Sequence, residues 1–191
     1  MVSVSKLLLA LPLFATALAS DLSIVPISGT SMGAVQLADG NTRLYYQDST
    51  TGAINAVVVS NVFTTGQSQG VSLLVPQDEV RKPTPVAVSL IAATGLEFVQ
   101  LHVFFFSPEN ILSEYHWNET IGLFQGGASC VTCITNEGFV GVAGSDMLYA
   151  MANNATSPPT LRVGFVSAGS PGTISEAVNT GNGWSIASLT T

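Results

Sequence analysis

The sequence LHVFFFSPENILSEYHW at residues 101–117 has the composition of a complete β-hairpin. Aromatic and β-branched side chains, which favour extended structure, fill residues 102–106. Residues 107–110 (SPEN) supply turn chemistry, and an alternating pattern resumes at residues 111–115. These features predict two antiparallel strands joined by a turn.

The same pattern occurs twice more along the chain. Residues 43–57 and 162–177 each contain a strand-like segment, a turn and a second strand-like segment. The three copies begin at residues 43, 102 and 162, so the spacing is 59 and then 60 residues. Because self-similarity at a fixed period is typical of repeat architectures, we expect one structural unit used three times.

Each copy carries additional strand-like segments. Residues 34–37, 86–92 and 147–151 precede the three hairpins, and weaker apolar segments such as 71–75 and 139–142 lie between them. No window shows sustained helical periodicity. About four short antiparallel strands in a repeat of this size are typical of a β-propeller blade. The predicted fold class is therefore all-β, with three propeller-blade repeats per chain.

Three blades do not close a propeller, since such rings typically have about 4–8 blades. An open fan would expose the apolar flank of each terminal blade, which a solvated protein avoids. Two solutions remain open. Two three-blade chains form a homodimer that closes the ring, or the sequence is a fragment or a degenerate relative of a longer propeller.

Residues 1–19 have the features of a secretory signal peptide. Lys6 is followed by an apolar run at residues 7–18, interrupted only by Thr16, and small residues surround the expected cleavage site after Ala19. The run is shorter than the ~20 residues of a membrane span. We expect a secreted, extracellular protein without membrane insertion, whose repeat domain occupies residues 20–191.

The composition restricts the partners. Charged residues make up 9% of the chain and apolar residues 47%. After the leader only four cations remain against 12 acidic residues, namely Arg43, Arg81, Lys82 and Arg162. This balance argues against binding to nucleic acid or to an anionic membrane.

Cys130 and Cys133 form a C-x-x-C motif. A redox motif would need a helix beginning at the first cysteine, whereas the glycine-containing residues 126–129 favour extended structure. A zinc site would need two more ligands, and His102 and His116 belong to a different hairpin. A local disulfide without a catalytic role is the favoured interpretation.

Two sequons predict a glycoprotein. They are Asn118-Glu119-Thr120 and Asn154-Ala155-Thr156, and both lie next to predicted hairpins. We expect both asparagines in exposed loops, in agreement with secretion.

Charged side chains recur at fixed positions of the repeat. Arg43 and Arg162 share one position, with His102 there in the middle copy, and Glu114 and Glu176 share another. His102 and Glu114 are equidistant from the turn centre expected at Pro108, and similar counting pairs Arg162 with Glu176 around Gly169. Both combinations are predicted to be directly opposite pairs on one face of the sheet.

Such pairs have two interpretations. An exposed arginine–glutamate pair is commonly part of a solvated face and contributes ~0–1 kcal/mol. Alternatively, a guanidinium and a carboxylate at fixed spacing suit adjacent sugar hydroxyls, with an aromatic ring covering the apolar face of the sugar. The aromatic candidates are Phe63, Trp117 and Trp184, for which packing between blades is the commoner role.

Several segments in a common phase resemble the repeat of the fungal fucose-specific lectins. They are LRV (161–163), ISE (174–176) and GNGW (181–184) in the third copy, NILSE (110–114) in the second and RLYYQD (43–48) in the first. The resemblance implies a six-bladed propeller architecture. It also implies a ligand held between adjacent blades by Arg and Glu from one blade and by an aromatic residue from its neighbour.

Carried over by position, the resemblance implies sites of unequal quality. The third repeat keeps both polar anchors, Arg162 and Glu176, with Trp184 at one family aromatic position and Asn179 in place of another. Arg162 and Glu176 are therefore expected to form the best site, with fucosylated glycans as partners and no cofactor.

The other two repeats depart from the family pattern. The second keeps Glu114 and Trp117 but has His102 in place of Arg, and the first keeps Arg43 while Ala56 replaces Glu. Since losing a charged hydrogen-bond partner costs ~1.5–3 kcal/mol, we expect the first repeat to be structural.

The expected function is binding of fucosylated glycans without catalysis. A propeller glycosidase would need two positioned carboxylates, and three arginines spread over three repeats do not form the cluster that sialidase-like enzymes use. The alternative is a secreted propeller scaffold that has lost sugar binding and acts in protein or surface interaction.

Overall fold

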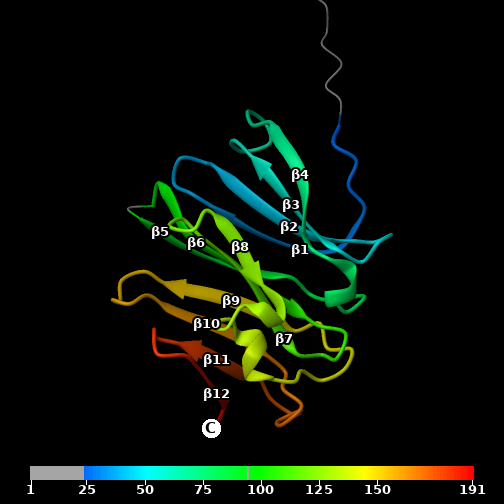
Figure 1. Ribbon diagram of the computed structural model, residues 1–191, viewed down its shortest axis with the longest axis vertical. Coiled ribbons are helices and arrows are strands. Elements are labelled where there is room, and N and C mark those ends of the chain that lie inside the picture. Colours follow the sequence, from blue (N-terminus) through cyan, green and yellow to red (C-terminus); the bar gives the residue numbers. More distant parts are fainter. Residues whose placement is uncertain (1–23, 94) are drawn as a thin grey trace, which may run out of the picture.

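The computed structural model describes residues 24–93 and 95–191, so the predicted leader lies outside the described residues. The described part of the chain contains three four-stranded antiparallel sheets (Figure 1). Their strands are β1 (Gly29–Gln36), β2 (Thr42–Asp48), β3 (Ile54–Val59) and β4 (Ser68–Val75); β5 (Ala87–Ala93), β6 (Glu97–Phe106), β7 (Leu112–Asn118) and β8 (Leu123–Gly126); and β9 (Leu148–Asn153), β10 (Thr160–Phe165), β11 (Ser175–Asn179) and β12 (Trp184–Ser188).

Each sheet is a simple meander, because its strand order follows the chain. The prediction of an all-β chain with three blades of four antiparallel strands is confirmed. The first strands of successive blades contact one another, β1 with β5 and β5 with β9, so that the three sheets stack as a fan (Figure 1).

Irregular segments complete the described fold. Three short 3-10 helices, η1 (Gln77–Glu79), η2 (Gly127–Ser129) and η3 (Ile134–Glu137), lie in the connections between blades. Residues 139–142, expected to be strand-like, form only two isolated bridges, Ile111 with Val140 and Gly141 with Ser167. These bridges join the β6–β7 turn to the β10–β11 turn and thereby connect the second and third blades.

The core lies between the sheets, and β6 serves both of its halves. Val103 and Phe105 pack into the cluster shared with the first blade, whereas Phe104 and Phe106 pack into the cluster shared with the third. The run of aromatic residues in β6 is therefore buried on both faces, as expected for a strand in the middle of three layers. Each buried Phe contributes roughly 1.5–3 kcal/mol through removal of apolar surface from water.

Arg81 holds the blade connections together. Its Nη1 donates to Oδ1 of Asn110 at 3.0 Å and its Nη2 donates to the carbonyl oxygen of Ser145 at 2.8 Å. The guanidinium also lies over the ring of Phe106, 4.9 Å from its centroid. This cation therefore has a structural role in positioning the second and third blades.

The hairpin register differs from the prediction. Phe106 pairs with Leu112, so the turn of the second blade is centred on Glu109 and not on Pro108. Five residues therefore separate the paired Phe106 and Leu112, and one of them, Asn110, adopts a left-handed conformation with φ of 60°, which asparagine tolerates in turns. His102 is consequently opposite His116, while Glu114 is opposite Phe104.

The third blade shows the same displacement. Arg162 is opposite Val178, and Glu176 is opposite Gly164. The predicted directly opposite pairs are therefore wrong, and each acid lies diagonal to its partner. Because the shift is two residues, an even number, the side chains remain on the same face of the sheet and within reach of one another.

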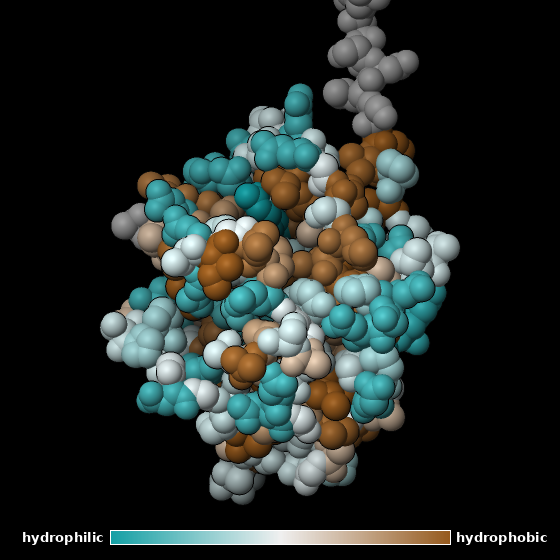
Figure 2. Space-filling model, in the orientation of Figure 1, coloured by the Kyte–Doolittle hydropathy of each residue, from teal (hydrophilic) through white to brown (hydrophobic). Residues whose placement is uncertain are grey.

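The described surface mixes polar and apolar side chains. Figure 2 shows hydrophobic and hydrophilic residues interspersed across one face of the molecule, which is normal for a domain with few charges. Among the described residues, no helix has both the length and the apolar character needed to cross a membrane.

Candidate ligand-binding site

The strand registers define equivalent positions on the three blades. The first position lies on the second strand of each blade, opposite Val58, His116 or Val178. The second position lies on the third strand of the blade, diagonal to the first. The first position holds Arg43, His102 and Arg162, and the second holds Ala56, Glu114 and Glu176.

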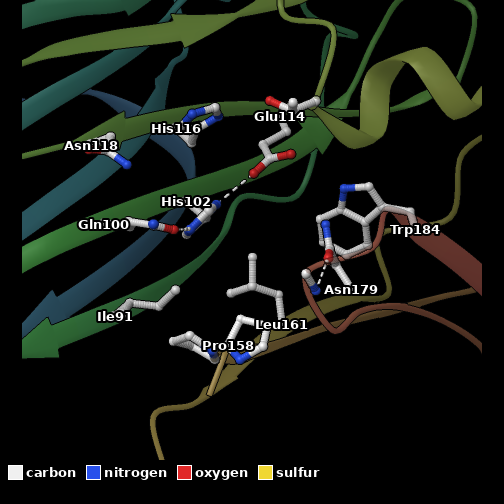
Figure 3. A pocket seen from close by; sticks show the side chains of 13 residues that line it. Ile91, Gln100, His102, Glu114, His116, Asn118, Pro158, Leu161, Asn179 and Trp184 are labelled. Atoms are coloured by element: carbon white, nitrogen blue, oxygen red, sulfur yellow. Dashed lines mark hydrogen bonds and ion pairs between the residues drawn. The ribbon is translucent and has the colours of Figure 1, made fainter. Parts of the chain in front are cut away.

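A cavity of about 290 Å³ lies between the second and third blades. His102 and Glu114 of the second blade contribute to one wall, and Trp184 and Leu161 of the third blade contribute to the other (Figure 3). The cavity therefore combines polar groups from one sheet with an aromatic ring and aliphatic carbon from the next.

The polar wall is organised around the imidazole of His102. Its Nδ1 lies 2.6 Å from Oε1 of Glu114, and its Nε2 lies 3.1 Å from Oε1 of Gln100 (Figure 3). The other carboxylate oxygen of Glu114 accepts the backbone N–H of Ile134 at 3.0 Å. Glu114 is 2% exposed, so this carboxylate supports the fold as well as the wall of the cavity.

The apolar wall is built around Trp184, which is opposite Asn179 in the β11–β12 ladder. The indole makes an edge-to-face contact with Phe104, with ring centroids 6.0 Å apart. Within residues 24–93 and 95–191, the buried Nε1 of Trp184 has no hydrogen-bond partner. The side chain of Asn179 is already engaged, because its Oδ1 accepts the backbone N–H of Gly181 at 2.7 Å.

Trp184 does not face the two polar anchors of its own blade. Along β10, Leu161 and Val163 are buried, whereas Arg162 between them is exposed. Trp184 belongs to the cluster packed against the second blade, while Arg162 and Glu176 lie on the other face of the sheet. The residues expected at the third-repeat site are thus divided between two faces.

Arg162 and Glu176 form a two-pronged ion pair on the open flank of the third blade. Nε and Nη2 of Arg162 donate to the two carboxylate oxygens of Glu176 at 2.8 and 2.7 Å. The hydroxyl of Tyr149 also donates to Glu176, at 2.8 Å. The hydrogen bond from Arg162 is the largest cause that holds the pKa of Glu176 below its usual range, and Tyr149 adds to it.

A smaller cavity of about 240 Å³ lies between the first and second blades. Arg43 contributes to it from the first blade, and Trp117 and Phe124 contribute from the second. The guanidinium of Arg43 lies over the ring of Phe98, 4.5 Å from its centroid. Because Ala56 stands at the acid position, this cavity lacks the carboxylate that the other two blades carry.

The aromatic positions follow the same repeat. Trp117 is opposite Phe124 as Asn179 is opposite Trp184, so Trp184 corresponds to Phe124, and Asn179 corresponds to Trp117. Phe63 is 75% exposed in the β3–β4 connection and lines neither of these cavities. Counting residues from each hairpin does not separate Phe63 from the two tryptophans. The strand register does.

The sequon asparagines occupy different environments. Asn118 is the last residue of β7, lines the cavity between the second and third blades, and accepts the backbone N–H of Thr120 at 2.8 Å. Asn154 is exposed between β9 and β10. The expectation that both lie in loops therefore applies to Asn154, while Asn118 is half-buried at a strand end.

Sequence reasoning favoured a local disulfide between Cys130 and Cys133 but missed the proximity of His116 to it. Cys130 and Cys133 form a disulfide, and the loop that carries them folds back on β7. Nδ1 of His116 lies 3.3 Å from Sγ of Cys133 and 3.8 Å from Sγ of Cys130. Burial lowers the pKa of His116, and His102 adds to that effect, while Glu114 opposes it. His116 and the two cysteines belong to separate segments of the sequence, and no sequence pattern indicates that they lie close together.

No protein-family model matches the chain, and no curated protein matches it. Solved structures do. A mutant of Aleuria aurantia lectin in complex with alpha-methyl-L-fucoside has a TM-score of 0.63 and 21% identity, over 87% of this chain and 51% of that one. SapL1 lectin in complex with alpha methyl fucoside has a TM-score of 0.60 and 16% identity, over 83% and 46%. AofleA from Arthrobotrys oligospora has a TM-score of 0.50 and 13% identity, over 82% and 55%.

The chain thus spans about half the length of these structures. At such identities the likeness concerns the fold. It agrees with the three meander sheets. The chain has the fold of the fucose-specific lectins that its sequence resembles.

Proposed function

We propose that this chain is a secreted carbohydrate-binding protein that binds fucosylated glycans without catalysis. The observation that carries the proposal is the cavity between the second and third blades, where His102 and Glu114 face Trp184 across the blade boundary. The fold of two lectins in complex with a fucoside supports it.

The cavity has the chemistry that a sugar ring requires. A pyranose has hydroxyl groups that donate and accept hydrogen bonds, and a face of C–H groups that packs on an aromatic ring. The side chains of Gln100 and His102 supply polar groups, and Trp184 and Leu161 supply apolar surface. A volume of about 290 Å³ is at the lower end for ligand pockets, which suits one sugar unit.

The Arg162–Glu176 pair is proposed as a second site that needs another blade. In the two cavities, polar groups of one blade face aromatic residues of the blade that follows it in the chain. Arg162 and Glu176 occupy the equivalent positions on the third blade, and no further blade of the described residues faces them. We propose that the first blade of a second copy packs there, which makes the protein a homodimer with a closed ring.

The flank of the third blade provides the test of that arrangement. Met151 is 44% exposed and lies opposite Arg162 in the β9–β10 ladder. Sedimentation velocity should show a dimer for the wild type and a monomer for Met151→Asp, because a charge on this flank opposes packing of an apolar surface. A monomeric wild type would contradict the dimer while leaving the cavity between the second and third blades intact.

Secretion and glycosylation belong to the same proposal. We infer cleavage after residue 19 and N-linked glycans at Asn118 and Asn154. Mass spectrometry of the secreted protein before and after enzymatic deglycosylation would give both the mature N-terminus and the occupied asparagines. A product that retains residues 1–19 and stays inside the cell would contradict this part.

Titration calorimetry with alpha-methyl-L-fucoside tests the binding itself. We expect saturable binding by the wild type, reduced at least tenfold in affinity by Trp184→Ala at one site and by Arg162→Ala at the other. Phe63→Ala is the matched control, since Phe63 is an exposed aromatic residue outside these cavities. No heat with the fucoside, and no signal with a panel of fucosylated oligosaccharides, would favour the alternative of a scaffold that acts in protein or surface interaction.

One observation gives that alternative its weight. Three of the polar anchors are engaged inside the protein. Glu114 binds Ile134 and His102, and Arg43 lies over Phe98. A scaffold that no longer binds sugars would keep these contacts for stability alone. The calorimetric titration separates the two functions. A sugar-binding protein gives a heat of binding that Trp184→Ala reduces, whereas a scaffold gives no heat of binding in either form.

A further inference from the structure

The sequon asparagine at the end of β7 lies on the polar wall of the cavity between the second and third blades. Asn118 is opposite Gln100 in the β6–β7 ladder, as His116 is opposite His102. Because alternate residues of a strand share one face of the sheet, these four side chains lie on the same face, and all four line the cavity. Trp117 lies between His116 and Asn118 in the strand and lines the other cavity, between the first and second blades.

Asn118 is close to the imidazole at the centre of that wall. Nε2 of His102 lies 3.1 Å from Oε1 of Gln100, and Gln100 is directly opposite Asn118. The Cβ atoms of such opposite residues are about 4.5–5.5 Å apart. Figure 3 shows the amide nitrogen of Asn118 on the side of Gln100 and the cavity. A group attached to that nitrogen therefore extends over the polar wall.

Hydrogen bonds set the orientation of the Asn118 amide. Its Oδ1 accepts the backbone N–H of Thr120 at 2.8 Å. This bond uses the carbonyl oxygen and leaves Nδ2 for a sugar, since N-linked glycans are joined to the side-chain nitrogen of the sequon asparagine. The backbone is also fixed, because the carbonyl oxygen of Asn118 accepts the N–H groups of Ile121 and Gly122 at 3.1 and 2.8 Å. The first sugar of a glycan therefore leaves the turn in a defined direction.

The sequon is accessible although its asparagine is half-buried. Glu119, Thr120 and Ile121 are all exposed in the connection between β7 and β8. A secreted chain receives its glycan during translocation, before the blades pack. Nδ2 of Asn118 then attacks the anomeric carbon of an oligosaccharide carried on a lipid diphosphate. The new N–C bond forms, the C–O bond to the diphosphate breaks, the amide loses one proton, and the lipid diphosphate leaves.

We propose that the N-linked glycan of Asn118 regulates this cavity, because its first N-acetylglucosamine covers the polar wall and competes with an incoming sugar. The inference rests on the proposed function, since it concerns the access of fucosylated glycans to the same site. A chain with an occupied Asn118 binds such glycans more weakly at this cavity than the same chain without the glycan. Glycosylation at this position thus sets how much of the binding capacity of the secreted protein is available.

The size of the cavity makes two sugars incompatible. Its volume of about 290 Å³ suits one sugar unit, and N-acetylglucosamine and fucose are one unit each. A sugar held by a short linker has an effective concentration on the order of millimolar, so the attached sugar competes without any specific contact. A site that is open about a fifth of the time binds its ligand about fivefold more weakly than a site that is always open.

The second sequon provides a matched control. Asn154 is exposed in the connection between β9 and β10 and lines neither of the two inter-blade cavities. A glycan at Asn154 adds the same bulk and polarity to the protein, but not on the polar wall. An effect on affinity that comes from the position of the glycan, and not from glycosylation in general, therefore appears at Asn118 and not at Asn154.

Titration calorimetry with alpha-methyl-L-fucoside tests the proposal on protein secreted by a host that attaches N-linked glycans. The parent protein carries Arg162→Ala, so that the heat comes from this cavity alone. Thr120→Ala removes the sequon but keeps the Asn118 side chain, and it should bind at least fivefold more tightly than the parent. Thr120→Ser keeps the sequon and Asn154→Gln removes the other glycan, so both should bind within twofold of the parent. Enzymatic trimming of the parent to one N-acetylglucosamine per site should not restore affinity.

Hydroxyl-radical labelling, quantified by mass spectrometry, supplies a measurement that needs no sugar ligand. Trp184 faces the polar wall across the cavity and should be labelled less in the glycosylated parent than in Thr120→Ala, whereas Phe63, outside both cavities, should be labelled equally. Protection of Trp184 without fucoside binding by any form would overturn the proposed function and leave the position of the glycan standing. An unoccupied Asn118, equal labelling of Trp184 with equal affinity, or full affinity in the trimmed protein would overturn the covering glycan and leave the proposed function standing.

Discussion

Nδ1 of His102 lies 2.6 Å from Oε1 of Glu114, although the two residues are diagonal and not opposite in the β6–β7 ladder. Arg162 and Glu176 repeat this arrangement in the third blade, with Nε and Oε1 2.8 Å apart. The environments differ, since the side chain of Glu114 is 2% exposed and that of Glu176 is 23% exposed. One repeated pair therefore stabilises the core in one blade and faces solvent in the next.

This difference predicts unequal costs for the same substitution. Glu114→Ala removes the acceptor of the Ile134 N–H and the partner of His102, which should lower the free energy of unfolding by roughly 2–4 kcal/mol. Glu176→Ala removes an exposed pair and should cost less than about 1 kcal/mol. Urea denaturation of both variants measures the contrast. Equal losses would show that the buried carboxylate has no structural role.

The hairpins could be predicted from sequence because their pattern is local. Alternation, turn residues and the 59- and 60-residue spacing define the strands and their repetition. The register could not be counted in the same way, because the turn that contains the left-handed Asn110 is two residues longer than the turn of a hairpin centred on Pro108 would be. The error was an even number of positions in both blades, so the prediction still placed each acid on the correct face.

The ion pair between Arg162 and Glu176 should be visible in the pH titration of the Glu176 carboxyl group. Arg162 holds the pKa of Glu176 below its ordinary value of 4.5, because its hydrogen bonds favour the ionised form. A depressed folded pKa contributes stability that is present above the unfolded value and is lost as pH falls through the folded value. The pair should therefore persist below pH 4.5 and break only at more acidic pH.

Carboxyl-resolved NMR titration measures this midpoint directly. Arg162→Ala should raise it toward the ordinary value, and Tyr149→Phe should raise it less, because the Tyr149 hydrogen bond is the smaller of the two hydrogen-bond contributions. Both changes lie on an exposed flank and should leave the fold intact. A midpoint that does not move in Arg162→Ala would mean that the pair is not formed in solution.

The site was less predictable than the fold because its parts come from different blades. Periodicity identifies which residues share a position, but it does not show that Trp184 faces the second blade while Arg162, in the same sheet, faces the open flank. The proximity of His116 to the cysteines depends on how a loop folds back on β7. Such contacts depend on tertiary structure and leave no periodic pattern.

Trp184→Phe separates the ring of this residue from its N–H. The buried Nε1 has no hydrogen-bond partner among the described residues, so losing it should change the free energy of unfolding by less than about 1 kcal/mol while the edge contact with Phe104 persists. Affinity for alpha-methyl-L-fucoside should stay within tenfold, because in the proposed complex the ring face, and not the N–H, contacts the ligand. A complete loss of binding in a folded variant would show instead that the N–H donates to the sugar.

The first blade offers a gain-of-function test of the whole arrangement. Ala56 is opposite Tyr45, as Glu114 is opposite Phe104 and Glu176 is opposite Gly164. Ala56→Glu would therefore place a carboxylate diagonal to Arg43, in a cavity that already contains Trp117 and Phe124.

The new acid should draw Arg43 away from Phe98, over which it now lies, and complete the polar anchors that this cavity lacks. Calorimetry should then show one more equivalent of alpha-methyl-L-fucoside bound per chain than in the wild type. Ala56→Gln, with the same size and no charge, is the control and should add none, because a neutral amide forms weaker hydrogen bonds than a carboxylate does. Unchanged stoichiometry in a folded Ala56→Glu protein, judged by circular dichroism, would show that matching the position of the acid is not sufficient to build a site.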